Sequence, residues 1–440
     1  MAARQITARL AGFGVPYTVD THEDYVQRDA AFSRDGACLV TNSADKRLRV
    51  FSLSHDDLAE GNPHALEPQT TIDSPEQINA YALWPQWESS AGNTTYLLHS
   101  VLHQPMRLVN AVDGSVLARY PLYDAYQEEY RNVMSLAFLN NGAQFIAGAR
   151  HRLALFDITR YNDAPIVEHV TAPPRRPRGM YKDARHIRGE FLALAVSPFS
   201  DLYAAGTETR KIALYDPAGR GECAALFSLQ TSSPGTGVTS LAWSPCGRYL
   251  YAAERNSDAI TVYDIRVAGC RLAVLRGRRA FTNQRLGFSV LPHDEAGQDH
   301  SIIAGGADGV VRVWNNPTSG EGVLDPSAEW RAHDGAVAST LVNPVAPSYI
   351  ATSTGERHFP SYDSDSNSSD PDSGSSDSDS DGTDSENSDA HSAHNDADAN
   401  NDVDADSIDV EANSNNSHTS ASKQSSTPPA PDHWLKVWNI

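Results

Sequence analysis

The chain ends in His433-Trp-Leu-Lys-Val-Trp-Asn-Ile440, and this stretch decides the fold. Its apolar and aromatic residues predict a buried β-strand. The preceding residues, 360–432, are rich in Ser, Asp and Asn and have almost no aliphatic side chains, so they cannot bury a core. We therefore predict that residues 360–432 are an insertion and that the final strand completes a sheet begun before it. Deletion of Trp434–Ile440 is expected to unfold the protein rather than to trim a tail.

The terminal stretch is the last copy of a repeat. In each copy, aliphatic residues are followed by an aromatic residue and then by a polar one. Earlier copies are Leu48–Ser52, Leu153–Asp157, Ile212–Asp216, Ile260–Asp264 and Val311–Asn315. With a degenerate unit that contains Ile78–Trp84, the chain divides into seven units with a period of about 40–60 residues, which is typical of WD-type propeller blades.

Each unit contains short strands rich in Val, Ile, Leu and Tyr, separated by turns such as Asp-Gly, Asn-Gly and Cys-Gly. The sequence therefore predicts an all-β fold, a seven-bladed WD40-type β-propeller with a long disordered acidic insertion in the last blade.

Four regions are predicted along the chain. Residues 1–24 are an N-terminal arm and ring-closing strand, and residues 25–359 hold blades one to seven, with only the first part of blade seven. Residues 360–432 are the disordered Ser/Asp-rich insertion, and residues 433–440 are the final strand of blade seven. That strand leaves the last blade without a fourth, outer strand. We expect the segment Ile6–Asp20 to supply it, which closes the ring and protects its edges.

The negative charge of the chain is local. Residues 361–432 contain 18 Asp and Glu residues and one Lys, and so carry −17 of the net charge of −21. The remainder is near neutral, so the overall acidity does not exclude a nucleic-acid partner. Four residues of the tract have an acid three positions later and are candidate phosphorylation sites: Ser369, Ser376, Ser378 and Thr383. The alternative is an inert, solvated spacer.

The sequence contains no catalytic, metal-binding or membrane-spanning signature. It has no P-loop, no nucleophile elbow and no GxGxxG after a strand, and its four cysteines are scattered without a CxxC pair. No apolar run approaches the roughly 18 residues of a membrane span. We therefore expect a protein that is not an enzyme, with no cofactor, no metal and no membrane contact.

Charged residues are predicted to separate onto two faces. In a four-stranded blade, the loop between the second and third strands shares a face with the loop that joins one blade to the next. This face is predicted to carry Lys46, Arg47, Arg150, His151, Arg152, Arg210, Lys211, Arg255 and Arg357, with the interblade residues Arg175, Arg176, Arg178, Lys182, Arg185, Arg188, Arg276, Arg278, Arg279 and Arg285. The opposite face is predicted to be more acidic, with Asp56, Asp57, Glu60, Glu222, Glu321 and Asp325.

A basic face is the electrostatic footprint of nucleic-acid binding. Arginines beside the aromatic residues Tyr181 and Phe281 favour unpaired RNA bases over duplex DNA. The alternatives are that these loops only keep the protein soluble, or that they bind an acidic protein. Since the acidic insertion leaves from the same predicted face, we hypothesise that it competes there with RNA.

Several phrases lie outside the general WD consensus. They are Thr41-Asn-Ser-Ala-Asp45 with Leu48-Arg-Val50, Asn79–Pro85, Phe281-Thr-Asn-Gln-Arg285 and Ala351–Pro360. These phrases resemble the first, second, sixth and seventh blades of the telomerase Cajal body protein 1 family of WD-repeat proteins. The resemblance implies a nuclear scaffold that binds the CAB box of small Cajal-body RNAs and of telomerase RNA. The fungal relatives of that family are linked to splicing through spliceosomal small nuclear RNAs.

The resemblance also implies an RNA-binding site. Carried over by position, Asn283, Gln284 and Arg285 are implied to read base edges through amide and guanidinium hydrogen bonds. Arg278 and Arg279 are predicted phosphate contacts. Charge placement alone adds three further RNA-binding candidates, Arg47, Arg152 and Lys211. The alternative is that Thr282–Arg285 is a polar cluster that holds the turn between two blades.

The sequence therefore favours a non-enzymatic RNA-binding WD-repeat scaffold in the biogenesis or trafficking of small nuclear, Cajal-body or telomerase ribonucleoproteins. The expected partners are small nuclear or small Cajal-body RNA of the box H/ACA type and ribonucleoprotein subunits, bound by a monomeric propeller in the nucleus or its Cajal bodies. The alternative is a protein-only scaffold in pre-mRNA splicing or in a methylation complex. A propeller enzyme ranks third.

Overall fold

The computed structural model describes residues 11–15, 27–53, 67–92, 94–172, 186–200, 202–216, 222–230, 234–294, 297–355 and 435–439. Contacts divide the chain into two units, one formed by Met1–His358 with Ala430–Ile440 and one formed by Phe359–Pro429. The second unit lies outside the described residues, and so do the predicted insertion and its candidate phosphorylation sites. The fold below is that of the first unit.

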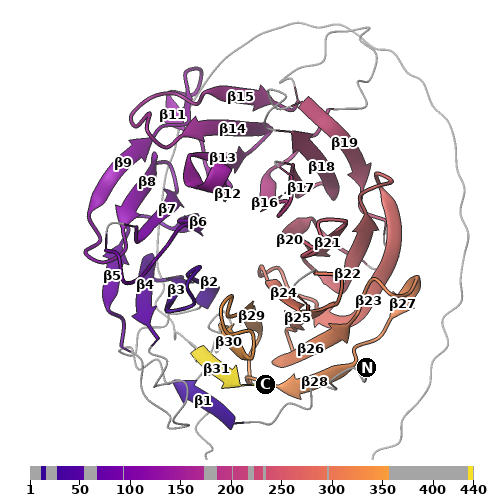
Figure 1. Ribbon diagram of the computed structural model, residues 1–440. Coiled ribbons are helices and arrows are strands. Elements are labelled where there is room, and N and C mark those ends of the chain that lie inside the picture. The colour runs from indigo at the N-terminus through magenta and orange to yellow at the C-terminus, as the bar shows by residue number, and fades with distance from the viewer. Residues whose placement is uncertain are drawn as a thin grey trace, which may run out of the picture. The chain divides into compact units, whose positions relative to one another are not determined.

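Seven antiparallel sheets follow one another around a ring, and the prediction of a seven-bladed all-β propeller is confirmed (Figure 1). Within the described ranges the helical structure is limited to one 3-10 turn, Asn140–Gly142. No described helix has the length and apolar character that a membrane crossing requires.

The strands of blades one to three, from the inside outward, are as follows. Blade one has β2 Gln27–Phe32, β3 Cys38–Ser43, β4 Arg47–Ser52 and β5 Thr70–Asp73. Blade two has β6 Ile78–Leu83, β7 Tyr96–Val101, β8 Met106–Asn110 and β9 Val116–Tyr120. Blade three has β12 Val133–Leu139, β13 Gln144–Ala149, β14 Arg152–Asp157 and β15 Val167–Val170.

The remaining blades repeat this meander. Blade four has β16 Phe191–Val196, β17 Tyr203–Thr207, β18 Lys211–Asp216 and β19 Glu222–Ser228. Blade five has β20 Val238–Trp243, β21 Tyr249–Glu254, β22 Ser257–Asp264 and β23 Cys270–Ala280. Blade six has β24 Phe288–Pro292, β25 His300–Gly305, β26 Val310–Asn315 and β28 Ala328–Arg331. Blade seven has β29 Val337–Val342, β30 Tyr349–Thr354, β31 Leu435–Asn439 and β1 Ala11–Val15.

The second strand of a blade is buried along most of its length, and β3, β17 and β25 are buried at every residue. Neighbouring blades cover both faces of each sheet, so side chains on both faces must be apolar or hydrogen-bonded. This explains why the repeated phrases show continuous apolar runs instead of strict alternation.

The described core consists of seven clusters, and each one fills the interface between two neighbouring blades. For example, Val40 of blade one packs with Leu97 of blade two, and Ile303 of blade six with Trp438 of blade seven. The cluster that contains Phe51 and Val437 joins blade seven to blade one. The ring is therefore held by side-chain packing at every joint.

Blade seven is assembled from three distant parts of the chain. β31 pairs with β30 on one side and with β1 on the other, and both pairings are antiparallel. On the β1 side the register runs from Ala11↔Asn439 to Val15↔Leu435. The N-terminal strand thus lies where the sequence places the fourth strand of the last blade. The four predicted domain boundaries themselves stay predictions.

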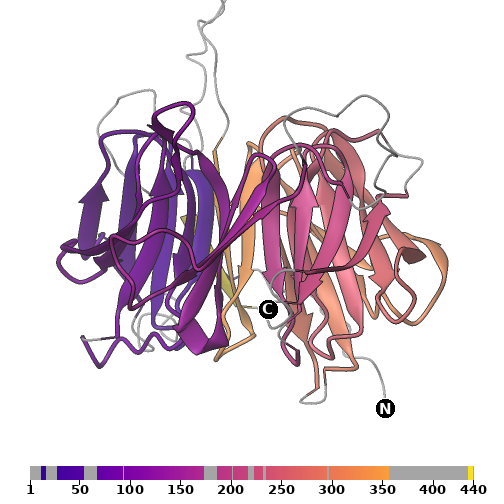
Figure 2. The same cartoon turned by 90° about the horizontal axis from the view of Figure 1, so that it is seen from above.

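Two short elements were not foreseen. β27, Gly322–Leu324, leaves blade six and adds a parallel fifth strand to the outer edge of β23 in blade five. A hairpin of β10, Tyr123–Asp124, and β11, Glu129–Tyr130, stands between blades two and three. Figure 2 shows the blades from the side, with the loops gathered at the two ends of the strands.

Candidate nucleic-acid interface

The predicted arrangement of the loops is confirmed. In blades one to six, each turn between the second and third strands is hydrogen-bonded to an interblade segment. Ser74 N–H donates to Lys46 O at 2.9 Å, and Asn256 N–H donates to Thr282 O at 3.1 Å. These two kinds of loop therefore share one face of the propeller, which we call the turn face.

Within the described residues the turn face is not uniformly basic, so the predicted separation of charge is wrong in this respect. Outside the described residues lie the predicted Arg175, Arg176, Arg178, Tyr181, Lys182, Arg185, Arg357, Asp56, Asp57 and Glu60. Arg47 pairs with Asp73 at 2.6 Å, and Arg152 pairs with Glu168. Arg210 donates two hydrogen bonds to Glu254, at 2.7 and 3.0 Å. Strand neighbours bring these carboxylates to the same face as the arginines.

The acidic residues also depart from the predicted map. Asp325 was assigned to the opposite face, but it pairs with Arg276 at 2.8 Å because β27 carries it beside β23. Lys211 makes a long contact of 3.5 Å to the carbonyl of His186. Arg47 and Arg152 are already neutralised locally, which weakens them as phosphate contacts, and Lys211 stays a prediction.

The segment Phe281–Arg285 lies between β23 and β24. Thr282 shapes it, since its N–H donates to Ala280 O at 2.9 Å and its hydroxyl accepts from Gln284 N–H at 3.2 Å. Asn256 donates from its side chain to Asn283 Oδ1 at 2.6 Å. The backbone φ of Asn256 is 49°, a value that an Asn tolerates in a tight hairpin turn. This polar cluster holds Asn283 at the surface of the turn face.

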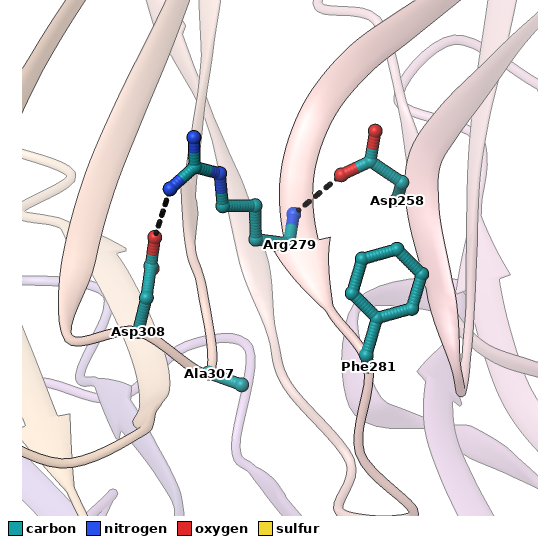
Figure 3. A pocket seen from close by; sticks show the side chains of 5 residues that line it. All are labelled: Asp258, Arg279, Phe281, Ala307 and Asp308. Atoms are coloured by element: carbon teal, nitrogen blue, oxygen red, sulfur yellow. Dashed lines mark hydrogen bonds and ion pairs between the residues drawn. The ribbon is translucent and has the colours of Figure 1, made fainter. Parts of the chain in front are cut away.

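An open pocket of about 560 Å³ adjoins this segment. Asp258, Arg279, Phe281, Ala307 and Asp308 line it, and they come from blades five and six (Figure 3). The Phe281 side chain is 58% exposed, which is unusual for an aromatic residue without a partner. The pocket therefore offers an apolar ring at its wall.

The charges in the pocket are balanced. Arg279 lies between Asp258, which accepts its backbone N–H at 2.9 Å, and Asp308, which its guanidinium approaches at 3.5 Å (Figure 3). Arg312 also donates to Asp308, at 2.6 Å. Burial raises the pKa of Asp308, but the hydrogen bonds and charge of Arg312 outweigh it and keep the pKa below its usual value. The pocket thus combines a ring, a guanidinium and carboxylate oxygens with little net charge.

Arg285 does not line the pocket. Its charge acts on Asp29 of β2 and on Tyr81 of β6. Burial raises the pKa of the Asp29 carboxyl, and the nearby Arg285 only partly opposes this effect. Asn283 is exposed, whereas Arg285 is half-buried.

The prediction that Arg278 contacts phosphate does not fit the structure, because its side chain is only 1% exposed. The pairing of β22 with β23 shifts between Ala259↔Arg276 and Ser257↔Ala280. This bulge, with a φ of 92° at Gly277, breaks the alternation of side chains and turns Arg278 inward. Arg279 is at the surface, where its guanidinium pairs with Asp308 at 3.5 Å, and its phosphate contact stays a prediction.

Comparisons with known proteins agree with this architecture. The family model described as "WD domain, G-beta repeat" matches residues 14–52 and 225–264. Human telomerase Cajal body protein 1 is 26% identical to this chain over 347 residues. The chain is a WD-repeat protein related to telomerase Cajal body protein 1. The predicted resemblance is thereby confirmed.

Fungal and insect proteins are also similar to this chain. A Schizosaccharomyces pombe protein named guanine nucleotide-binding protein negative regulator 1 is 28% identical over 76% of this chain and 81% of its own length. The Drosophila melanogaster homologue is 25% identical over 78% of this chain. The matched region spans 59% of the human and 59% of the Drosophila protein, so the chain corresponds to about three fifths of these animal relatives.

The predicted RNA-binding residues stay predictions, and the structure brings some of them together. Sequence reasoning found the segment around Asn283 and Gln284, together with Arg279, and the structure places these near Phe281. It missed Asp258 and Asn256, which reach the segment from the β21–β22 hairpin and the strand after it. The sequence signal that could have found them is Asn256 itself, because Asn is favoured in two-residue hairpin turns. Among the described residues, no group of three or more His, Cys, Asp or Glu is placed to hold a metal ion.

Proposed function

We propose that this chain is a non-enzymatic RNA-binding scaffold of small nuclear or small Cajal-body ribonucleoproteins, including that of telomerase, and that it acts in the nucleus and its Cajal bodies. The names of its animal relatives support this context. The single observation that carries RNA binding is the exposed ring of Phe281 in a pocket beside Arg279 and Asn283.

The pocket has the groups that recognise one unstacked base. A base stacks on the Phe281 ring, and the guanidinium of Arg279 adds a cationic edge. Carboxylate oxygens of Asp258 accept from exocyclic amino groups, and the side-chain amide of Asn283 offers hydrogen bonds to a base edge. Single-stranded RNA presents such splayed bases, whereas duplex DNA does not.

The ion pairs of the turn face change the expected salt dependence. Because Arg47, Arg152 and Arg210 are paired with carboxylates, fewer arginines of the described residues are free to replace counterions on the RNA backbone. We therefore expect a shallow salt slope, with stacking and hydrogen bonding as the main terms, where a uniformly basic face would give a steep one.

The test compares two exposed phenylalanines. Phe281→Ala is matched with Phe199→Ala, because Phe199 is 73% exposed and lies in the β16–β17 connection at the opposite end of the strands. Binding of box H/ACA-type loop RNA is measured by fluorescence anisotropy. Loss of one base stack should weaken binding by roughly 5- to 150-fold in Phe281→Ala and leave Phe199→Ala unchanged.

Crosslinking in nuclear extract with sequencing of bound RNA gives the identity of the ligand. Enrichment of box H/ACA or spliceosomal small RNAs by the wild type, and its loss in Phe281→Ala, would support the proposal. Absence of RNA above background, with protein partners retained, would refute it.

A protein-only scaffold is the second candidate, and the β10–β11 hairpin favours it. Tyr126 at the tip of this hairpin is 99% exposed, and Tyr123 and Tyr130 pack edge to face at its base. Such exposed aromatic groups are typical of protein interfaces. If Tyr126→Ala removes protein partners while no RNA crosslinks to the wild type, this second function replaces the first.

A further inference from the structure

Two arginines whose guanidinium groups make no hydrogen bond come together near the segment that carries Phe281. Arg255 is in the turn between β21 and β22, and Arg285 lies just before β24. The hydrogen bond of 3.1 Å from Asn256 N–H to Thr282 O joins the turn to the interblade segment. Since Asn256 follows Arg255 directly and Thr282 precedes Arg285 by three residues, both side chains start from one junction.

In the part of the chain that the structure describes, neither guanidinium makes a hydrogen bond or a close ion pair, and Arg255 Nε is buried without an acceptor. Carboxylates act on them only electrostatically, Asp29 on Arg285 and Glu190 and Glu208 on Arg255. Burial lowers the pKa of Arg255, and the charge of Arg285 lowers it further; Glu190 and Glu208 oppose this effect more weakly. The two positive charges therefore repel each other.

This arrangement contrasts with the rest of the turn face. Arg210 lies against the same hairpin and is held by two hydrogen bonds to Glu254, the residue before Arg255. A buried donor without an acceptor is destabilising, and nearby like charges add to that cost. A bound anion that accepts from both guanidinium groups would remove both penalties.

We propose that Arg255 and Arg285 form a phosphate-binding site, and that it holds a backbone phosphate of the RNA whose base occupies the Phe281 pocket. This inference rests on the proposed function for the identity of the ligand. Guanidinium groups match phosphate oxygens in paired hydrogen bonds, which an ammonium does not reproduce. Asn283, held by Asn256 at 2.6 Å, belongs to the same junction and links the phosphate site to the base pocket.

The first arm of the test uses inorganic phosphate alone. Thermal unfolding of the full chain is measured in phosphate and in chloride at equal ionic strength. The melting temperature of the wild type should rise with phosphate concentration, and this rise should disappear in Arg255→Gln and in Arg285→Gln. Arg248→Gln is the matched control, because Arg248 is exposed in the β20–β21 turn of the same blade, at the opposite end of its strands.

The second arm uses loop RNA over a range of salt concentrations. Each of Arg255→Gln and Arg285→Gln should weaken binding roughly tenfold and reduce the magnitude of the salt slope by about 1. Phe281→Ala should weaken binding with the slope unchanged, since stacking releases no counterion. Arg285→Lys should restore the slope but only part of the affinity.

The two arms separate the inference from the proposed function. Phosphate stabilisation that depends on both arginines, without RNA binding by the wild type, supports the phosphate site and refutes the RNA scaffold. RNA binding whose slope is the same in both Gln variants, with no effect of phosphate on melting, overturns the phosphate site and leaves the RNA scaffold standing.

Discussion

The indole N–H of Trp438 donates a hydrogen bond of 2.8 Å to the hydroxyl of Thr352, across 86 residues of chain. The same hydroxyl contacts His333 Nε2 at 2.8 Å, and all three side chains are buried. The last strand of the chain is thereby joined to the strand before the insertion and to the loop that leads into blade seven. Loss of this junction would loosen the blade where the ring closes.

Trp438→Phe tests the hydrogen bond. The aromatic character is kept, but the Thr352 hydroxyl loses a donor, so we expect the free energy of unfolding in urea to fall by about 1–2 kcal/mol. Trp330→Phe is the matched control, because Trp330 is equally buried, at 7% exposure, and its indole N–H has no partner. An equal loss in both variants would show that packing, and not the hydrogen bond, determines the effect.

Removal of β1 tests ring closure. Deletion of residues 1–15 exposes the edge of β31, and unpaired strand edges promote association between chains. We expect a lower melting temperature and higher-order species in size-exclusion chromatography with light scattering. Deletion of residues 1–10 keeps β1 and should behave like the wild type. A monomeric 16–440 variant with unchanged melting would contradict the closure role.

Arg278→Met tests the buried arginine. Burial lowers the pKa of Arg278 to about 10, and its Nε and Nη1 have no partners. An apolar side chain of similar length should therefore leave the melting temperature unchanged or raise it. RNA binding should also be unchanged, because Arg278 is not at the surface.

Arg312→Met is the contrasting variant. Arg312 is as buried as Arg278, but it pairs with Asp308 at 2.6 Å, and its loss leaves that carboxylate with fewer donors. We expect a loss of about 1–3 kcal/mol, reduced by the partial solvent exposure of Asp308. If Arg278→Met lowers the stability as much as Arg312→Met, then the absence of a charge partner does not explain the difference expected between these two buried arginines.

Because His99 is buried, we expect the stability of the fold to decrease in acid. Burial, and to a smaller extent the charge of Arg107, lower the pKa of His99 to about 3, while an unfolded His titrates near 6.5. The unfolded state therefore takes up the proton first. The free energy of unfolding should fall as the pH drops from about 6.5 towards 3, by about 1.4 kcal/mol per pH unit.

The measurement compares urea unfolding at pH 7 and pH 5. Between pH 7 and pH 5, the free energy of unfolding of His99→Leu should fall by about 2 kcal/mol less than that of the wild type. His103→Asn is the control, because His103 is exposed and its φ of 55° is tolerated by Asn. Identical pH dependence in the wild type and His99→Leu would exclude His99 as the titrating group.

The strands were predictable because they repeat. The copy of the repeat at Leu153–Asp157 is the third strand of blade three, found at Arg152–Asp157, and the copy at Val311–Asn315 is the third strand of blade six, found at Val310–Asn315. Each such strand is buried by its neighbours on both faces, so its apolar run is strong and local. By contrast, β27 could not be foreseen, because its parallel pairing with β23 depends on two blades being side by side.

The candidate site was predictable only in part. The segment Phe281–Arg285 stood out as a phrase, but the partners of its side chains come from hairpins in two blades. Loop type placed the arginines on the correct face, whereas the carboxylates that neutralise them arrive from neighbouring strands. Arg278 was misplaced because a β-bulge reverses the side to which a residue points, and the local sequence does not show where a bulge occurs.

The sequence by itself determined the number of blades, the position of the described inner strands and the return of the chain after the insertion, because apolar periodicity and the need to bury it are local properties. Only the tertiary structure decided which charges meet. Whether Arg47 finds Asp73, or Arg255 is left beside Arg285, depends on distances of a few ångströms between strands and loops that are remote in the chain. Coulomb energies and hydrogen bonds change steeply over such distances.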